Sequence, residues 1–243
     1  MTGTDTGVGK TAVACGLVTI LREAGKQVGV LKPVETGCDE NTLAPLDALA
    51  LSAAAGYRLS GFPGEGEALP PEAVVPWRFR DPLAPEDAAR LEGAEVGVDK
   101  IYQAMDAWME RADMVVVETA GGLLVPLNST FNNADLIRGM ELPVAVAAEN
   151  RLGVINHTLL TLEALRTRGL TPICVVLSDI SPDLDESCEL NQAAISRHGK
   201  VPVYRVARNP EDPADEAARC LKVFSEDILM EVERELARVS KRY

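Results

Sequence analysis

The chain has 243 residues, enough for a sizeable core in one domain or two small ones. Hydrophobic residues make up 47% and charged residues 25%, so a disordered chain, a collagen-like repeat and a coiled-coil rod are excluded. Acidic residues outnumber basic ones by 37 to 24, giving a net charge of −13, and no basic stripe stands out; we expect no nucleic-acid partner. The longest apolar runs are far shorter than the roughly 20 residues of a membrane span, so we expect no membrane partner.

The N-terminus and the cysteines bear on the cellular compartment. The sequence opens with MTGTD, which has neither the basic nor the apolar region of an export signal. Its five cysteines are an odd number, and none are spaced as C-x-x-C. The two histidines cannot complete a Cys/His zinc site at these separations. We therefore expect reduced thiols and a cytoplasmic protein.

Apolar runs alternate with amphipathic stretches along most of the chain. In chain order, we predict a helix over 10–24, a strand over 28–32, helices over 46–55 and 98–111, a strand over 114–118, a helix over 133–139, a strand over 143–148, a helix over 154–168, a strand over 171–177, a helix over 185–198, a strand over 203–206 and a helical segment over 213–243. Such alternation, with continuously apolar strands, predicts an α/β fold whose mainly parallel sheet has helices on both faces.

Residues 56–85 interrupt this alternation. They contain four glycines and six prolines, which indicates a long surface loop with a short extended piece near 74–79 and a partly buried aromatic edge around Trp77. The chain shows no internal repeat. We therefore expect a single domain over residues 1–243, elaborated by this loop.

The strongest functional signal lies at the very start, where residues 3–11 read GTDTGVGKT. Glycines let backbone N–H groups point toward a phosphate, and the N-terminus of the following helix adds partial positive charge. Lys10 can reach the β- and γ-phosphates, and the Thr11 hydroxyl can bind Mg²⁺. Five residues rather than four separate Gly3 from Gly9. A strand should precede such a loop, yet only two residues do; either the given sequence begins inside that strand, or the strand is a stub.

Charged residues follow two of the predicted strands. Lys32 ends one strand, and the carboxyl ends of parallel strands border the ligand crevice, so we expect Lys10 and Lys32 to face one solvated crevice. A surface lysine is the alternative. Glu118 ends another strand, where a metal-binding carboxylate suits a phosphate loop. Asp47 by itself indicates a helix start more than a ligand. Asn156 is predicted to cap the helix that it opens.

Together these stretches resemble the dethiobiotin synthetase family over nearly the whole chain. The resemblance rests on the order and spacing of several motifs, namely Gly3–Thr11, Lys32-Pro33-Val34 with Thr36-Gly37, Asp47-Ala48-Leu49-Ala50, Glu118 with Ala120-Gly121-Gly122, Pro126-Leu127, Leu152–His157 and Asn209-Pro210-Glu211. The five-residue spacing in the phosphate loop is the form found in that family.

The resemblance implies a P-loop NTPase-like homodimer that binds ATP, Mg²⁺ and 7,8-diaminopelargonate. One amine would take up CO2 to give a carbamate, whose oxygen attacks the γ-phosphate. The other amine would then close the ureido ring of dethiobiotin and expel phosphate. The diamine would bind near the subunit interface.

The resemblance also assigns residues by position. It places Lys10 and Lys32 as catalytic residues and Thr11, Asp47 and Glu118 as Mg²⁺ ligands. It places in the nucleotide site Thr6, Gly7, Val8, Gly9, Lys10, Thr11, Ala12, Asp47, Glu118, Thr119, Ala120, Gly121, Ser178, Asp179, Asn209 and Glu211. It places in the substrate site Thr36, Leu152, Gly153 and Asn156. The chain departs from the family at Ser178, where asparagine is frequent, and at Thr119, where glycine is frequent.

Two other P-loop classes are alternatives. An amidoligase of the cobyrinate type would need a glutaminase half, for which 243 residues leave no room. A partition-type ATPase switch carries an extra lysine early in its phosphate loop, where this chain has Thr4, Asp5 and Thr6.

Overall fold

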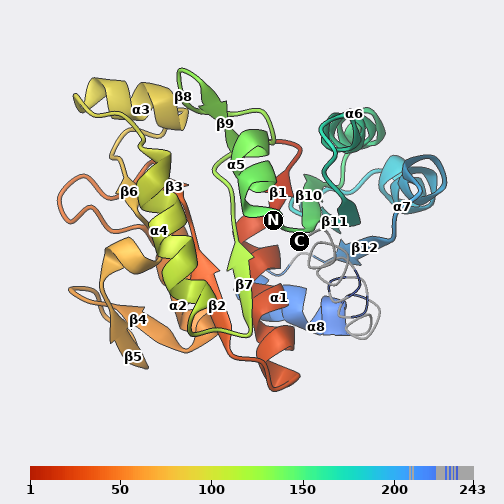
Figure 1. Cartoon of the computed structure of the whole chain (residues 1–243). Coiled ribbons are helices and arrows are strands. Elements are labelled where there is room, and N and C mark those ends of the chain that lie inside the picture. Colours follow the sequence, from red (N-terminus) through yellow and green to blue (C-terminus); the bar gives the residue numbers. More distant parts are fainter. Residues whose placement is uncertain are drawn as a thin grey trace.

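The computed structural model describes residues 1–207, 209, 211–222, 228, 230, 232 and 234. Its largest sheet is parallel and has the order β1 (Thr2–Gly3), β10 (Val144–Glu149), β11 (Pro172–Ser178) and β12 (Val203–Val206). A second parallel pair joins β2 (Val28–Leu31) to β7 (Met114–Val117) (Figure 1). The mainly parallel sheet predicted from the sequence is thereby confirmed.

The first strand, β1, joins these two sheets. Its Met1 ammonium donates a hydrogen bond to the Val117 carbonyl at 2.6 Å, and the Thr119 N–H donates to the Met1 carbonyl at 3.0 Å. On its other side, Thr2 pairs with Val146 of β10. Next to Met1, an apolar cavity of about 280 Å³ lies between β7 and β10. Burial lowers the pKa of the Met1 ammonium to about 6.

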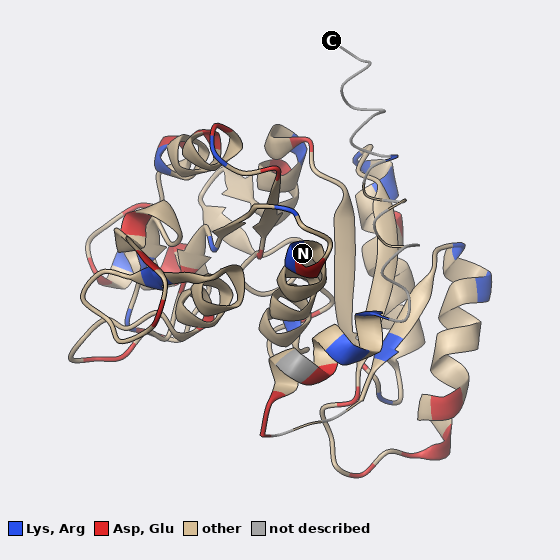
Figure 2. Ribbon diagram, turned by 90° about the horizontal axis from the view of Figure 1, so that it is seen from below, with Lys and Arg blue, Asp and Glu red and all other residues tan. Residues whose placement is uncertain are grey.

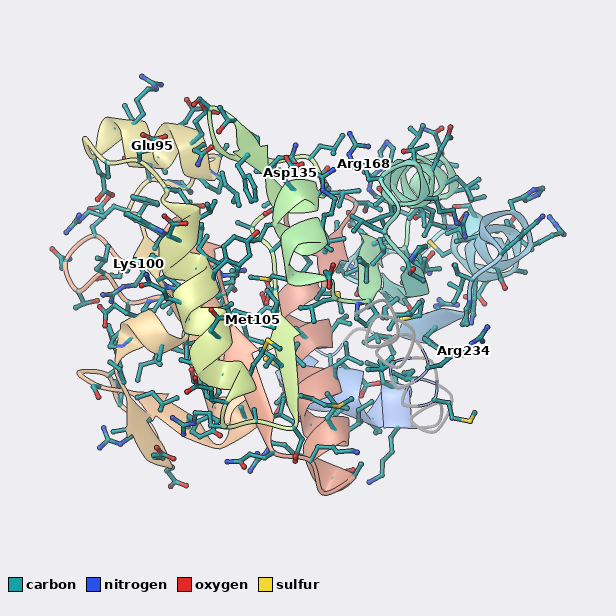
Figure 3. All side chains as sticks on the ribbon, viewed as in Figure 1. Glu95, Lys100, Met105, Asp135, Arg168 and Arg234 are labelled. Carbon is teal, nitrogen blue, oxygen red and sulfur yellow. The ribbon has the colours of Figure 1, made fainter. Side chains whose placement is uncertain are left out.

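Helices cover both faces of the sheet, as expected for parallel strands whose side chains are apolar on both faces. One face packs against α4 (Val98–Met109), α5 (Asn133–Met140), α6 (Val154–Thr167) and α7 (Glu186–Gly199). The other face packs against α1 (Lys10–Glu23), α2 (Leu46–Ala55) and α8 (Pro213–Lys222). In β10, Val146 faces the first group while Ala145 faces the second. In Figure 3, Met105 extends from α4 toward β7, within the first face.

The predicted elements agree with the observed ones to within two residues at each end, the usual uncertainty of helix and strand ends. The final predicted helix begins at Pro213 as expected, but most of its residues beyond 222 lie outside the described part of the chain. Helix α3 (Pro85–Leu91) was not predicted, because its first residue belongs to the Pro-rich stretch. Among the described residues, no helix is long and apolar enough to cross a membrane.

The stretch 56–85 is more structured than a surface loop. It contains the parallel pair β4 (Tyr57–Leu59) and β5 (Glu67–Leu69), a 3₁₀ turn at Pro71–Ala73, and β6 (Trp77–Arg78), which pairs with β3 (Val34–Glu35). Its apolar side chains are buried against α1, α2 and β2, namely Leu59, Leu69, Val74 and Val75. The expectation of a surface excursion is therefore wrong for these residues, because apolar burial outweighs the turn-forming composition.

The aromatic edge around Trp77 has the predicted form. The Trp77 ring is partly buried and stacks on Phe79 with a centroid distance of 6.1 Å. The Lys100 ammonium lies 4.9 Å from the Trp77 ring centroid (Lys100 is labelled in Figure 3). A short antiparallel pair, β8 (Pro126–Asn128) and β9 (Phe131–Asn132), completes the strands of the described chain. Basic residues are interspersed with acidic ones along the ribbon in Figure 2.

Candidate active site

The phosphate loop joins β1 to α1 and takes its shape from two glycines. Gly7 and Gly9 have φ angles of 74° and 84°, in the left-handed region that glycine adopts at little cost. Gly9 is the N-cap of α1, and no side chain of the described residues caps this helix, so its first N–H groups can bind an anion. Lys10 is buried and donates a hydrogen bond to the Asp5 carbonyl at 2.8 Å, so it lies over the loop.

A cleft of about 680 Å³ opens next to this loop. Its walls come from the phosphate loop, the start of α1, and the segments that follow β2 and β7. It brings together most of the predicted residues, namely Thr6, Gly7, Gly9, Lys10, Thr11, Ala12, Lys32, Thr36, Asp47, Glu118, Ala120 and Gly121. The expected convergence of strand ends on one crevice is therefore observed.

At the centre of the cleft, one lysine bridges two carboxylates. Lys32 Nζ lies 2.6 Å from Glu118 Oε1 and 2.7 Å from Asp47 Oδ2. Thr11 Oγ1 donates to the same Glu118 oxygen at 2.9 Å. The other oxygen, Glu118 Oε2, is buried and has no hydrogen-bond partner among the described residues. Such a buried carboxylate oxygen needs a cation or water.

These residues fit a bound Mg²⁺. Hard divalent cations bind carboxylate and hydroxyl oxygens, and the orphaned Glu118 oxygen lies beside Thr11 at the phosphate loop. Within the part of the chain that the structure describes, no group of three or more His, Cys, Asp or Glu side chains could hold a metal. A metal in the cleft would therefore combine Asp47 and Glu118 with the Thr11 hydroxyl and the phosphates of a nucleotide.

Lys32 is neither a surface lysine nor a residue facing open solvent. Only 3% of its surface is exposed, so the expectation of a solvated crevice is wrong at this position. Burial lowers the pKa of the Lys32 ammonium, but attraction by Glu118 and Asp47 outweighs this effect, and the net pKa lies above the usual value. Burial and the repulsion of Lys32 both lower the pKa of Lys10. The two lysines are thus electrostatically coupled, and Lys32 neutralises the carboxylates that a metal would bind.

Asp47 lies in the first turn of α2, as predicted, and it also faces the cleft. Burial raises the pKa of its carboxyl, but Lys32 lowers it more strongly, so the net pKa is below the usual value. The sequence alone did not single out Glu35, the buried residue that holds Asp47 in place. Both Glu35 carboxylate oxygens accept backbone hydrogen bonds, from Asp47 N–H at 2.8 Å and Ala48 N–H at 2.9 Å.

Ser178 and Asp179, which the resemblance places in the nucleotide site, lie outside this cleft. Ser178 Oγ is buried without a partner among the described residues, and a Cβ built on Gly9 would lie 2.8 Å from it. Asp179 accepts hydrogen bonds from Asn150 Nδ2 at 2.7 Å and from Arg205 Nε at 2.8 Å. The sequence did not indicate this network, because its members come from the ends of three different strands.

The remaining predicted nucleotide residues are also placed by the structure. Val8 is a buried residue of the phosphate loop, and the Thr119 hydroxyl donates to Thr2 Oγ1 at 3.0 Å. The Asn209 side chain accepts hydrogen bonds from the backbone N–H groups of Glu211 at 3.1 Å and Asp212 at 3.3 Å. None of these residues lines the cleft. Their contact with a nucleotide remains a prediction.

The predicted substrate residues separate into two places. Thr36 lines the cleft. Leu152, Gly153 and Asn156 lie at the start of α6, outside it, and the Leu152 side chain is 72% exposed. Gly153, with φ 91°, is the N-cap of α6, so the expectation that Asn156 caps this helix is wrong. The left-handed conformation favours glycine there, and Asn156 becomes an exposed residue of the first turn.

The chain is similar to known proteins over most of its length. A family model described as an AAA domain matches residues 1–214. The ATP-dependent dethiobiotin synthetase BioD of Anaeromyxobacter dehalogenans is 45% identical over 205 residues, covering 81% of this chain and 83% of that protein. The protein of the same name from Bacillus licheniformis is 39% identical over 214 residues, covering 87% and 86%. That from Methanococcus vannielii is 34% identical over 217 residues, covering 87% and 93%.

The fold is also similar to solved structures. The MinC:MinD cell division protein complex of Aquifex aeolicus has a TM-score of 0.52 at 13% identity, covering 94% of this chain and 93% of that one. The septum site-determining protein MinD of Pyrococcus horikoshii, complexed with Mg-ADP, has a TM-score of 0.50 at 13% identity, with the same coverage. At this identity the likeness concerns the fold alone, and it confirms the predicted P-loop NTPase-like class.

Proposed function

Because the chain belongs to the ATP-dependent dethiobiotin synthetase family, we propose that its cleft joins CO2 to 7,8-diaminopelargonate and closes the ureido ring. The chain is an ATP-dependent ligase that forms dethiobiotin. The amidoligase and partition-type alternatives are not favoured, since the curated relatives above carry the synthetase name and the likeness to MinD concerns the fold alone.

One observation carries the assignment of roles within the cleft. Lys10 and Lys32, from different elements, lie in the same cleft as Thr11, Asp47 and Glu118. The phosphate chain of ATP lies along the N-terminus of α1, where backbone N–H groups and Lys10 hold its charge. Thr11, Asp47 and Glu118 would hold Mg²⁺, which would offset the charge that develops in phosphoryl transfer.

The reaction then runs in three steps. One amine of the diamine attacks CO2, forming an N–C bond and losing a proton to give a carbamate. A carbamate oxygen attacks the γ-phosphorus; an O–P bond forms, and the bond to ADP breaks. The second amine attacks the carbonyl carbon of the resulting carbamic-phosphoric anhydride, loses a proton as the ring closes, and expels phosphate with the electrons of the C–O bond.

Lys32 acts where negative charge converges. The carbamate and the γ-phosphoryl group approach each other in the second step, and a buried cation stabilises that arrangement more than the separated reactants. The Thr36 hydroxyl, in the same cleft, contacts the diamine. Lys32, which pairs with Asp47 and Glu118, would be freed for this role if these carboxylates held Mg²⁺.

The proposal includes a homodimer with the diamine near its interface. Three exposed leucines near α6 and the segment after β7 support an apolar contact surface: Leu124 at 51%, Leu152 at 72% and Leu160 at 56% exposure. Leu124 and Leu160 border one depression beside Thr4–Thr6 of the phosphate loop. The uncapped N-terminus of α6 at Gly153 would receive the substrate carboxylate. Light scattering of Leu160→Glu beside wild type tests this, and an unchanged dimer would refute it.

The proposed compartment is the cytoplasm, and it is supported by the thiols: none of the five cysteines, all of which lie in the described residues, forms a disulfide bond, and reducing compartments maintain that state.

The activity is tested by product analysis. Purified protein is incubated with ATP, Mg²⁺, ¹³C-bicarbonate and 7,8-diaminopelargonate, and mass spectrometry follows dethiobiotin. The expected product carries one ¹³C atom and appears in equal amount to ADP, and Lys10→Ala should form almost none. Folded wild-type protein that binds ATP yet releases no labelled product would refute the proposal.

A further inference from the structure

Glu35 is a buried carboxylate outside the set of residues assigned above. It lies in β3 and is 5% exposed, and the described residues place no lysine, arginine or histidine in ion-pair contact with it. Its carboxylate instead accepts two backbone hydrogen bonds from the first turn of α2, at 2.8 Å from Asp47 and 2.9 Å from Ala48. A buried carboxylate in this position needs such donors.

The N-terminus of α2 has no cap of its own. Its N-cap residue is Pro45, whose side chain offers no acceptor, although the first N–H groups of a helix require partners. Glu35 supplies both partners, and its side chain reaches the helix from β3. The start of α2 is therefore positioned by Glu35, which precedes Asp47 by 12 positions in the chain.

The backbone of Glu35 is itself held by contacts with β6 and with Cys38. It pairs with Arg78 in the parallel β3–β6 ladder, and its carbonyl accepts a hydrogen bond from Phe79 N–H at 2.9 Å. The Cys38 thiol donates to the same carbonyl at 3.6 Å. The carboxylate thus extends from an anchored strand rather than from a free loop.

The residue that Glu35 holds is the one whose carboxylate faces the metal position. The Asp47 N–H is bound by Glu35, while Asp47 Oδ2 accepts from Lys32 at 2.7 Å. We propose that Glu35 is a positioning residue that fixes the Asp47 carboxylate for Mg²⁺ binding; this inference rests on the proposed function. Partners that orient a metal ligand commonly change metal affinity 10–100-fold when they are removed.

The test measures metal binding and stability separately. Mn²⁺, as the probe, is titrated into the protein complexed with a non-hydrolysable ATP analogue, and electron paramagnetic resonance counts free metal. Glu35→Ala should raise the Mn²⁺ dissociation constant at least tenfold, and Glu35→Gln, which keeps one acceptor, should give a smaller rise. Asn132→Ala is the matched control, since Asn132 accepts from the N–H groups of Ala134 and Asp135 at the start of α5. It should lower the melting temperature and leave the dissociation constant within twofold.

A double-mutant cycle shows whether Glu35 acts through Asp47. In an Asp47→Asn background, Glu35→Ala should add little further loss of Mn²⁺ affinity, because the ligand to be positioned is already gone. An unchanged dissociation constant in Glu35→Ala and Glu35→Gln, or full additivity in the cycle, would overturn the inference. Neither result involves the diamine, so both are separable from failure to form dethiobiotin. Wild-type protein that binds no Mn²⁺ would overturn the metal site itself.

Discussion

Replacing Lys32 should destabilise the protein more than any change on its surface. Lys32 is the cation nearest to two carboxylates, and Glu118 is fully buried. Removing one partner of a buried ion pair leaves an uncompensated charge and costs about 3–5 kcal/mol. The Asp47 side chain is 41% exposed, so solvent screens it and its pair adds only about 0–1 kcal/mol. We therefore expect Lys32→Met to lose about 3–5 kcal/mol of unfolding free energy without metal.

Urea unfolding measures this change, with Lys100→Met as the control. Lys100 also makes specific contacts, since its ammonium donates to the Pro76 carbonyl at 2.6 Å, but its surface is exposed. Its loss should cost about 1 kcal/mol or less. Combining Lys32→Met with Glu118→Gln should recover much of the stability, because both charges of the pair are then removed.

The same variants separate stability from catalysis. Mg²⁺ and ATP should partly restore the stability of Lys32→Met, because the metal brings a cation to Glu118. Turnover should still fall by about 10²–10³, since the Lys32 ammonium is then missing where the carbamate and phosphoryl charges converge. The reasoning is refuted if Lys32→Met unfolds at the wild-type urea concentration, or if it turns over at the wild-type rate.

Four further outcomes follow from other residues. Lys10→Ala should weaken ATP binding as well as turnover, measured by nucleotide titration beside kinetics, because Lys10 is proposed to contact phosphate both before and during the reaction. Discrimination between ATP, GTP and CTP should be weak and unchanged in Ser178→Ala, since the Ser178 hydroxyl lies against Gly9; a strong ATP preference that this variant abolishes would contradict it. Burial raises the pKa of the Cys38 thiol to about 12, so thiol reagents should label it slowly at pH 7 and Cys38→Ala should stay active. Burial raises the pKa of the Glu35 carboxyl to about 7 from 4.5. The contribution of Glu35 to the free energy of unfolding is therefore present below pH 4.5 and is lost as the pH rises through 7. Urea unfolding at several pH values should show this loss as a pH-dependent difference in stability between wild type and Glu35→Gln.

The sequence predicted the parts of the site that depend on strand ends. Lys32 and Glu118 follow apolar strands, β2 and β7, whose identity the Val-rich pattern made clear. Parallel strands align their carboxyl ends, and so the meeting of the two side chains followed from topology. Their burial and direct pairing did not follow, because the sequence does not show how closely the neighbouring loops cover the cleft.

The parts that the sequence did not predict depend on contacts between distant segments. Glu35, in β3, accepts a hydrogen bond from the start of α2. Asp179 accepts hydrogen bonds from Asn150 and Arg205, which come from the ends of neighbouring strands. Neither pattern has a local signature, since the donors and acceptors are ordinary polar residues until the fold brings them together. Asp47 likewise gained its role from resemblance, because a carboxylate in a first helical turn is common for reasons of helix dipole alone.

Charge balance in the cleft links metal and nucleotide binding. Lys10 and Lys32 offset Asp47 and Glu118, so these four charges sum to zero when the lysines are protonated and the carboxylates ionised. Without a nucleotide, Mg²⁺ at the unpartnered Glu118 Oε2 would lie near two lysines, one of which is 2.6 Å from Glu118 Oε1, in a site of low dielectric where repulsion is strong. The phosphates of ATP bring negative charge that both lysines can pair with. They would also give Lys32 a new anionic partner if Asp47 and Glu118 bound the metal. The metal and the nucleotide should therefore bind more tightly together than either binds alone, by a coupling that reciprocity makes equal in both directions.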